Sequence, residues 1–201
     1  MPLSERTLAT LLDDIGAKSP APGGGAVVSI VGSIAAALAQ MVVNYSLGRK
    51  SLALHEPALR DALHALVRSR AVLLELAEED MEAYAALNEV QRLPESDPRR
   101  ARELPALASA ASRIPLAVVA ACADLVRRCE ALADKTNPHL RSDLAIAALL
   151  SECAARAGRW NVAINAPLLP EDDARALLGE ADSLLHTARE RLARVEAACA
   201  P

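Results

Sequence analysis

The sequence predicts an all-α protein, a single bundle of about six helices that forms one domain over residues 1–201. Hydrophobic residues make up 52% of the chain, and alanine and leucine dominate them, whereas Phe is absent and only one Trp and two Tyr occur. Helices favour Ala, Leu, Glu and Arg, and strands favour β-branched and aromatic side chains. Apolar residues also recur at helical spacing between Gly and Pro breakpoints, which indicates several long helices.

The first two helices flank a segment that is rich in proline and glycine. Ser4 can cap a short helix, which carries an apolar stripe from Leu8 to Ile15 and ends at Gly16. A second helix, over about residues 25–47, is apolar nearly all round. Such a helix lies inside a fold, so we expect a buried, Ala/Gly-rich central helix.

Two long helices follow. The third is predicted over about residues 57–93, because proline suits the first turn and Leu-Pro marks the end. The fourth is predicted from Asp97-Pro98 to about residue 133. Pro105 and Pro115 lie within it, and each lacks the N–H that an inner turn of helix uses. We therefore expect a break near Pro105 and a kink at Pro115.

The last two helices are separated by short turns. Asn137-Pro-His is typical of a turn, and Ser142 can cap a fifth helix that reaches about residue 163. A sixth helix is predicted over about residues 170–198, with three acidic residues in its first turn, where they suit the helix dipole.

Composition and charge exclude several classes of protein. The formal net charge is −4, and no long basic tract or set of stacking aromatics indicates nucleic-acid binding. The N-terminus does not resemble a signal peptide. The most apolar run, residues 26–43, is interrupted by polar residues and fits a core helix better than a membrane span. We expect a cytoplasmic protein without nucleic-acid or membrane partners.

The cysteines indicate neither zinc binding nor a disulfide framework. There are four, with no CxxC pair and no Cys/His ligand spacing, so we expect no metal. Cys122 and Cys129 lie seven residues apart on one helical face. We interpret them as small buried hydrophobic residues in a reducing compartment.

The motif PAPGGG at residues 20–25 precedes the second helix. Three glycines leave the backbone bare, so free N–H groups and the positive end of the helix dipole can face a polar or anionic ligand. No Gly-Lys-Ser/Thr follows and no strand precedes, so the motif is neither a P-loop nor a dinucleotide fingerprint. A tight turn that needs glycine only for packing explains the motif equally well.

Asp80 is an acidic residue on an apolar helix face. Helical spacing turns it toward the stripe that contains Ala77 and Tyr84, whereas Glu78 and Glu79 point away. Burial would raise its pKa toward a value that suits acid/base chemistry. The structural alternative is a carboxylate bonded to a buried arginine or to a helix end.

A third group of polar residues surrounds the fifth helix. Asp143 lies at its start, where compensation of the helix dipole alone would explain an acid. That does not explain Asn137 near the same end, or Asn161 and Asn165, which are one turn apart and share a face. Buried asparagines need hydrogen-bond partners, and a heterocyclic ligand would supply them.

Together these motifs resemble the cyclodeaminase/cyclohydrolase family, which includes the C-terminal domain of formiminotransferase-cyclodeaminase and free-standing methenyltetrahydrofolate cyclohydrolases. The run SPAPGGGAVVSIVGSIAAALAQMVVNYSLGRK resembles the opening of that family. The similarity continues in order through Asp80 with Tyr84, Leu93-Pro94, Pro115, Asn137, Ser142-Asp143 and NVxxN at 161–165, and it covers the chain from the first helix to about Pro170. Arg49 stands where relatives are expected to have lysine.

The resemblance implies an all-α homodimer that acts on tetrahydrofolate one-carbon forms, with no cofactor beyond that substrate. We expect either methenyltetrahydrofolate cyclohydrolase or formiminotetrahydrofolate cyclodeaminase activity, with Asp143 or Asp80 as the acid/base. Arg49 and Lys50 could attract the glutamate tail, although a helix C-terminus with favourable cations explains them equally well. The predicted substrate-binding residues are Pro22, Gly23, Gly24, Gly25, Asn44, Arg49, Lys50, Tyr84, Asn137, Ser142, Asn161 and Asn165.

Two other classes of protein compete with this hypothesis. One is a non-catalytic folate-binding or helical assembly protein, and the other is a purely structural bundle, which leaves PAPGGG unexplained. The enzyme hypothesis requires that the glycine turn and both aspartates line one cavity, within a subunit or across a subunit boundary.

Overall fold

The structure, a computed structural model, describes residues 2–200, so the two ends of the predicted 1–201 domain lie outside the described residues. Within that range the chain is helical and contains no strand, which confirms the predicted all-α class. The six α-helices are α1 (Leu8–Gly16), α2 (Gly24–Asn44), α3 (Glu56–Gln91), α4 (Pro98–Leu132), α5 (Arg141–Asn165) and α6 (Glu171–Cys199). Short 3-10 helices are η1 (Leu3–Glu5), η2 (Lys50–His55), η3 (Pro138–Leu140) and η4 (Ala166–Leu168).

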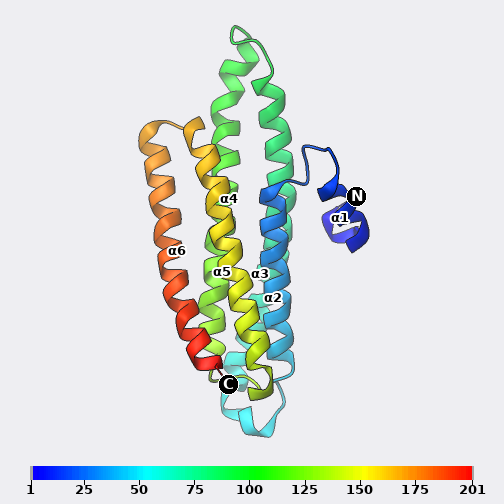
Figure 1. The fold of residues 1–201 in the computed structure, drawn as a ribbon, viewed down its shortest axis with the longest axis vertical. Helices are drawn as coiled ribbons and strands as arrows, with labels where there is room; N and C mark the ends of the chain where they lie inside the picture. The colour runs from blue at the N-terminus through cyan, green and yellow to red at the C-terminus, as the bar shows by residue number, and fades with distance from the viewer. Residues whose placement is uncertain (1, 201) are drawn as a thin grey trace.

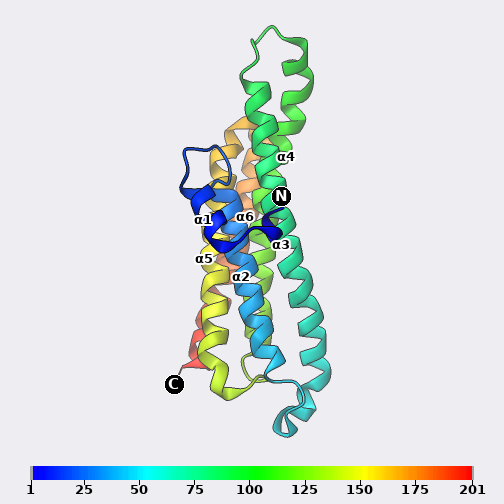
Figure 2. The same cartoon turned by 90° about the vertical axis from the view of Figure 1, so that its right-hand side faces the viewer.

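Helices α2 to α6 run side by side in an elongated bundle, and α1 lies apart from it beside the start of α2 (Figure 1). The hairpin between α3 and α4 extends beyond the other helices at one end (Figures 1 and 2). Helix α4 packs against α3, α5 and α6, and also touches α2. The central position therefore belongs to α4, not to α2 as the sequence pattern predicts.

Helix α2 is buried on one side only. Ten of its residues are buried, but Ile34 is 54% exposed on the opposite side. Figure 2 shows α2 between α3 and α5, with no helix of the bundle in front of its C-terminal half. By length and composition α2 and α4 could each cross a membrane, a property that core helices of globular proteins share. All-round apolarity thus reflects an uncovered face in addition to a buried one.

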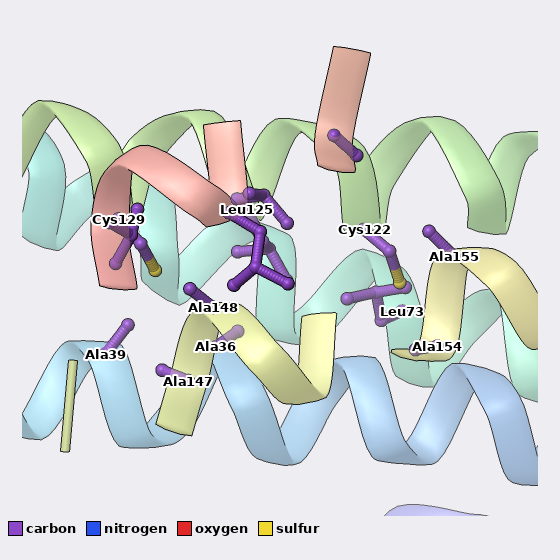
Figure 3. Close-up of a cluster of buried hydrophobic side chains, with 14 of the residues drawn as sticks. Ala36, Ala39, Leu73, Cys122, Leu125, Cys129, Ala147, Ala148, Ala154 and Ala155 are labelled. Atoms are coloured by element: carbon purple, nitrogen blue, oxygen red, sulfur yellow. The ribbon is translucent and has the colours of Figure 1, made fainter. Parts of the chain in front are cut away.

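Small side chains let the helices approach closely in the core. Figure 3 shows alanines of α2 and α5 facing Leu125, Cys122 and Cys129 of α4. A Cβ added to Gly32 would lie 2.7 Å from the Cys122 Sγ, closer than such atoms approach. Burial raises the pKa of the Cys122 and Cys129 thiols to about 12. Both are therefore inert core residues, as the sequence predicts.

Three predicted helix features differ in the structure. Thr7 caps α1, not Ser4, because its side chain accepts from the Thr10 N–H and Ser4 lies within η1. Helix α4 continues without a break through Pro105, which lies on an exposed turn where water can bond the freed carbonyl. Ser142 makes no capping bond, since α5 already begins at Arg141.

Candidate active site

A cleft opens where residues 20–25 lead into α2. The N-cap of α2 is Gly23, which has no side chain that could accept from the first N–H groups of the helix. These N–H groups therefore face the opening. The cleft has a volume of about 210 Å³. It is lined by Pro20, Ala21, Gly23, Gly24, Gly25, Asp80, Met81, Tyr84, Asn161, Ile164 and Asn165. Pro22 does not line it and is buried instead, which corrects its predicted place among the binding residues.

Asp80 points from α3 at the start of α2, in the direction that helical spacing predicts. The backbone N–H of Ala26 donates to its carboxylate. A Cβ added to Gly25 would lie only 2.2–2.4 Å from the carboxylate atoms, so the carboxylate can occupy this place only beside glycine. Burial raises the pKa of Asp80, and the hydrogen bond from Ala26 opposes this in part. The acid is thus both bonded to a helix end and held in the cleft.

Asn165 donates to a backbone carbonyl of α4 that a proline leaves without its usual donor. Pro115 has no N–H to donate to the carbonyl of Ala111 within α4, and Asn165 Nδ2 donates to that carbonyl at 2.7 Å instead. Ser112 Oγ also donates to the backbone carbonyl of Asn165 at 3.3 Å. Because the amide nitrogen is engaged, the Oδ1 of Asn165 remains as an acceptor beside the cleft.

Asn161 and Tyr84 line the cleft from two different helices, α5 and α3. Asn161 lies one turn before Asn165, and a Cβ built on Gly24 would be 3.5 Å from its Oδ1, an ordinary contact. Tyr84 is 46% exposed at the rim. The cleft therefore combines one carboxylate, two carboxamides, bare backbone and an aromatic edge.

The remaining predicted residues lie at the other end of the bundle. Asp143 is in the first turn of α5, about 27 Å from Asn161 at 1.5 Å per residue. Asn137 is buried in the turn before it, where its backbone N–H donates to Ser46 Oγ at 2.8 Å and its Oδ1 accepts from the His139 N–H at 3.2 Å. The expectation that both aspartates line one cavity is therefore wrong for a single chain.

The residues grouped with Asp143 at this distant end are exposed or turn residues. They are Asn44 at the end of α2, Arg49 and Lys50 after it, Asn137, and Ser142. None of them lines the cleft.

Sequence reasoning missed several lining residues. Pro20 and Ala21 begin the same loop, and Met81 and Ile164 adjoin residues that were predicted. Ile164 is 75% exposed although it lies between two polar positions of the NVxxN motif. The available signal was a strongly apolar side chain at a position of α5 that helical spacing turns toward solvent.

No metal centre is visible in the part of the chain that the structure describes, because residues 2–200 contain no group of three or more His, Cys, Asp or Glu side chains that could hold an ion. The cleft itself offers a single carboxylate.

Comparison with known proteins gives consistent results. Residues 7–182 match the family model described as formiminotransferase-cyclodeaminase. The chain is 31% identical over 164 residues to methenyltetrahydrofolate cyclohydrolase of Methylorubrum extorquens, covering 80% of this chain and 79% of that protein. It is 30% identical over 198 residues to formimidoyltransferase-cyclodeaminase of Sus scrofa, covering 96% of this chain and 37% of that protein.

A solved structure shares the fold. The crystal structure of formiminotetrahydrofolate cyclodeaminase from Thermotoga maritima matches with a TM-score of 0.90 and 30% sequence identity, over 97% of this chain and 96% of that chain. The present chain thus spans nearly all of the bacterial cyclodeaminase, but only about a third of the two-activity formimidoyltransferase-cyclodeaminases from pig and mouse.

Proposed function

Because the chain belongs to the formiminotransferase-cyclodeaminase family, we propose that it is an enzyme of folate one-carbon metabolism, either a methenyltetrahydrofolate cyclohydrolase or a formiminotetrahydrofolate cyclodeaminase. The observation that carries this proposal is the Asp80 carboxylate, held at the bare N-terminus of α2 in a cleft that asparagines share. The similarity to proteins named for each reaction supports both activities equally.

The two reactions make the same demands on a site. The cyclohydrolase reaction adds water to the methenyl carbon between N5 and N10, and the C–N5 bond then breaks as N5 gains a proton. The cyclodeaminase reaction closes N10 onto the formimino carbon, and the amine leaves as ammonia after gaining a proton. Each reaction passes through a tetrahedral carbon bonded to both N5 and N10, and each needs a group that accepts and then returns a proton.

Asp80 supplies such a group. As a carboxylate it takes a proton from the attacking water or N10, and its negative charge favours the cationic methenyl form. It then returns the proton to the departing nitrogen. Burial raises the pKa of Asp80, which makes the protonated acid a more available partner than an exposed aspartic acid.

The asparagines and the glycine loop would orient the substrate. Asn165 Oδ1 is fixed as an acceptor because its Nδ2 is bonded to Ala111, so it suits an N–H of the reduced pterin. Gly24 and Gly25 let a flat ring lie against backbone N–H groups. No step of this chemistry calls for a metal, and we propose that the substrate is bound without a further cofactor.

Purified protein distinguishes the two activities directly. The decay of methenyltetrahydrofolate absorbance measures cyclohydrolase turnover, and release of ammonia from the formimino substrate measures cyclodeaminase turnover. Asp80→Asn is expected to lower kcat by about 10²–10⁴-fold, the range that general acid–base catalysis contributes. Glu79→Gln, one residue away on an exposed position, is the matched control and should keep wild-type turnover.

One specific observation favours a second candidate, a non-catalytic folate-binding protein. Asp80 accepts a hydrogen bond from a helix end, as a purely structural carboxylate would. Folate binding without turnover of either substrate in the wild-type protein would establish this candidate and contradict the enzyme.

The working form of the enzyme is, in this proposal, a cytoplasmic homodimer. Free cysteines are typical of proteins in a reducing compartment such as the cytoplasm, and both folate substrates are small soluble molecules. Analytical ultracentrifugation measures the mass in solution, and a monomer at all concentrations would contradict the dimer.

A further inference from the structure

A groove runs between α5 and α6, which lie side by side in Figure 1. Its volume is about 580 Å³, within the roughly 300–1,000 Å³ that is usual for small-molecule sites, and none of the described residues lines both this groove and the cleft at the start of α2. We define the α5/α6 groove by the side chains that could recognise a ligand, which are Arg156, Arg159, Trp160, Asp182, His186 and Arg189. Three arginines against one aspartate give these residues a net positive charge, which suits an anionic ligand.

Two of the three arginines have N–H groups to spare. Arg159 donates to both carboxylate oxygens of Asp182, at 2.9 and 3.1 Å, so its guanidinium is already engaged by a full partner. Arg156 and Arg189 instead approach one carboxylate, that of Glu152, at 3.7 and 3.4 Å. These distances exceed the about 2.7–2.9 Å of a charge-assisted hydrogen bond. Since a guanidinium has five N–H donors, both arginines have donors left for an anion in the groove.

Glu152 holds these two arginines from inside the bundle. It is 5% exposed, whereas the side chains of Arg156 and Arg189 are 55% and 59% exposed. A buried carboxylate needs charged partners, and here two exposed guanidinium groups share one such carboxylate. Two positive charges against one negative charge leave an excess of one positive charge at the surface of the groove.

A line of exposed side chains on α5 joins the groove to the cleft. Arg156, Trp160 and Ile164 are four residues apart, so they occupy one face of the helix on consecutive turns. Ile164 lines the cleft and Trp160 lines the groove, and they are 75% and 74% exposed. From Ile164 to Arg156 the helix rises about 12 Å, at 1.5 Å per residue. A ligand that begins in the cleft can therefore cross the Trp160 ring and reach the arginines along the protein surface.

The two available arginines lie at successive distances from the cleft. Arg159 pairs with Asp182 and Glu152 pairs with Arg189, so α5 and α6 run antiparallel and Arg189 lies at the level of Glu152. Glu152 is one turn beyond Arg156 on the side away from the cleft, at a rise of about 18 Å from Ile164. A ligand that meets both arginines therefore needs anionic groups repeated along an extended chain.

We propose that the α5/α6 groove binds the poly-γ-glutamate tail of the folate substrate, with the benzoyl ring against Trp160 and successive glutamate carboxylates at Arg156 and Arg189. The identity of this ligand rests on the proposed function. A folate carries a one-carbon unit, then a benzoyl ring, then glutamates, and the surface offers Asp80, an aromatic ring and arginines in the same order. The benzoyl ring packs on the indole, and each carboxylate fits the fork of a guanidinium. The cationic and anionic ends of the substrate thus meet opposite charges.

The dependence of KM on tail length tests this assignment. The groove variant is Glu152→Gln/Arg156→Gln/Arg189→Gln, in which the first substitution leaves no buried carboxylate without a partner. For the folate that the protein turns over, the wild-type KM should be about tenfold lower with several γ-linked glutamates than with none, and the groove variant should lose this preference. Arg175→Gln, at an exposed position of α6 outside the groove, is the matched control and should keep it. A wild type without the preference, or a groove variant that retains it, would overturn the proposal.

Fluorescence tests binding without any need for turnover. Trp160 is the only tryptophan of the chain, so its emission reports on the groove directly. The probe is p-aminobenzoyl-tri-γ-glutamate, which contains the tail but no pterin. It should change the emission of Trp160 with a Kd that rises about tenfold in the groove variant and also rises with added salt, because exposed ion pairs are screened. Unchanged emission of the wild type, or an equal Kd in the groove variant, would contradict the assignment.

The basic pair Arg49 and Lys50 offers a competing location for the tail. Both residues lie at the opposite end of the bundle, so Arg49→Gln/Lys50→Gln should bind the probe with the wild-type Kd. Weaker binding in this variant, with unchanged binding in the groove variant, would overturn the proposal. Failure of the proposed function gives a different result. A protein that binds the probe in the groove but turns over neither folate substrate keeps the tail site and loses only the reaction, whereas turnover without any dependence on tail length keeps the reaction and removes the tail site.

Discussion

The two polar ends of the bundle use the same residue types in different ways. At the glycine-loop end, defined by residues 20–25 with Asp80, Asn161 and Asn165, side chains of α3 and α5 reach backbone groups of other helices. At the turn end, defined by residues 44–50 and 137–143, Asp143 lies in the first turn of its own helix and Asn137 bonds within its own turn. The first end is assembled by tertiary contacts and the second mainly by local ones.

This difference bears on where chemistry can be controlled. A carboxylate that another helix desolvates has a raised pKa, as Asp80 does, and its position depends on close packing. A carboxylate in the first turn of its own helix is positioned by helix formation alone. Substitutions that disturb tertiary packing should therefore affect the glycine-loop end much more strongly than the turn end.

Among substitutions that keep the Asp80 carboxylate itself, the largest expected effect comes from one methyl group at Gly25. Gly25→Ala places a Cβ where the Asp80 carboxylate now lies, so the acid must move by about an ångström. Misplacement of that size can cost about 100-fold in turnover, and we expect a loss of this order in kcat/KM. Gly179→Ala on α6 is the control, since its Cβ would meet no atom within 4 Å, and it should stay within about twofold. Unchanged turnover of Gly25→Ala would mean that the position of the Asp80 carboxylate does not set activity.

The second effect compares the asparagines of the two ends. Asn165→Ala leaves the Ala111 carbonyl without its partner, which should lower the free energy of unfolding by about 1–3 kcal/mol. Asn137→Ala removes only a capping bond to the adjacent turn and should cost about 1 kcal/mol. Urea unfolding followed by circular dichroism measures both. A larger cost at Asn137 would reverse the proposed contrast between tertiary and local construction.

Features that depend on local spacing could be predicted from the sequence. The order of the long helices, the inward direction of Asp80 and the burial of Cys122 and Cys129 all follow from helical periodicity, and the structure has each of them. The helix ends were less predictable, because Ser4 and Thr7 both suit a cap and only the fold of the preceding turn selects Thr7.

Features that depend on which helices touch could not be predicted. The sequence presents Asn165 as a ligand for substrate, and nothing local shows that its Nδ2 satisfies a carbonyl freed by Pro115, fifty residues earlier. Likewise, apolar residues around all of α2 do not reveal which side a neighbour covers. The separation of Asp80 from Asp143 follows from the length and direction of α5, and spacing within each motif contains no information about it.

A third prediction measures the coupling between Pro115 and Asn165. In Pro115→Ala the new N–H can donate to the Ala111 carbonyl, so that carbonyl no longer depends on Asn165. Asn165→Ala should then cost about 1 kcal/mol less in the Pro115→Ala background than in the wild type. Four urea unfolding curves complete the double-mutant cycle. Additive effects would show that Asn165 stabilises the protein by some other contact.

The smallest expected effects have opposite signs at the two ends. Asp80→Asn should raise the unfolding midpoint at pH 7, and Asp143→Asn should lower the free energy of unfolding by about 0.3–1 kcal/mol. The asparagine at position 80 can still accept from the Ala26 N–H, but it carries no charge that burial penalises. The asparagine at position 143 removes the negative charge that favours the N-terminus of α5.

The pH dependence of unfolding tests whether loss of the buried charge explains the higher stability expected of Asp80→Asn. Since the folded-state pKa of Asp80 is raised, the folded protein holds this proton more tightly than the unfolded chain does, and ionisation lowers stability as pH rises from the unfolded value of about 3.9 through the folded value. The stability advantage of Asp80→Asn should therefore be larger at pH 7 than at pH 4.5 and shrink as pH falls toward 4. Thermal unfolding of both proteins between pH 7 and pH 4.5 measures it. A constant advantage would assign the gain to packing, and a loss of stability would mean that the charge on Asp80 itself helps to hold the start of α2 in place.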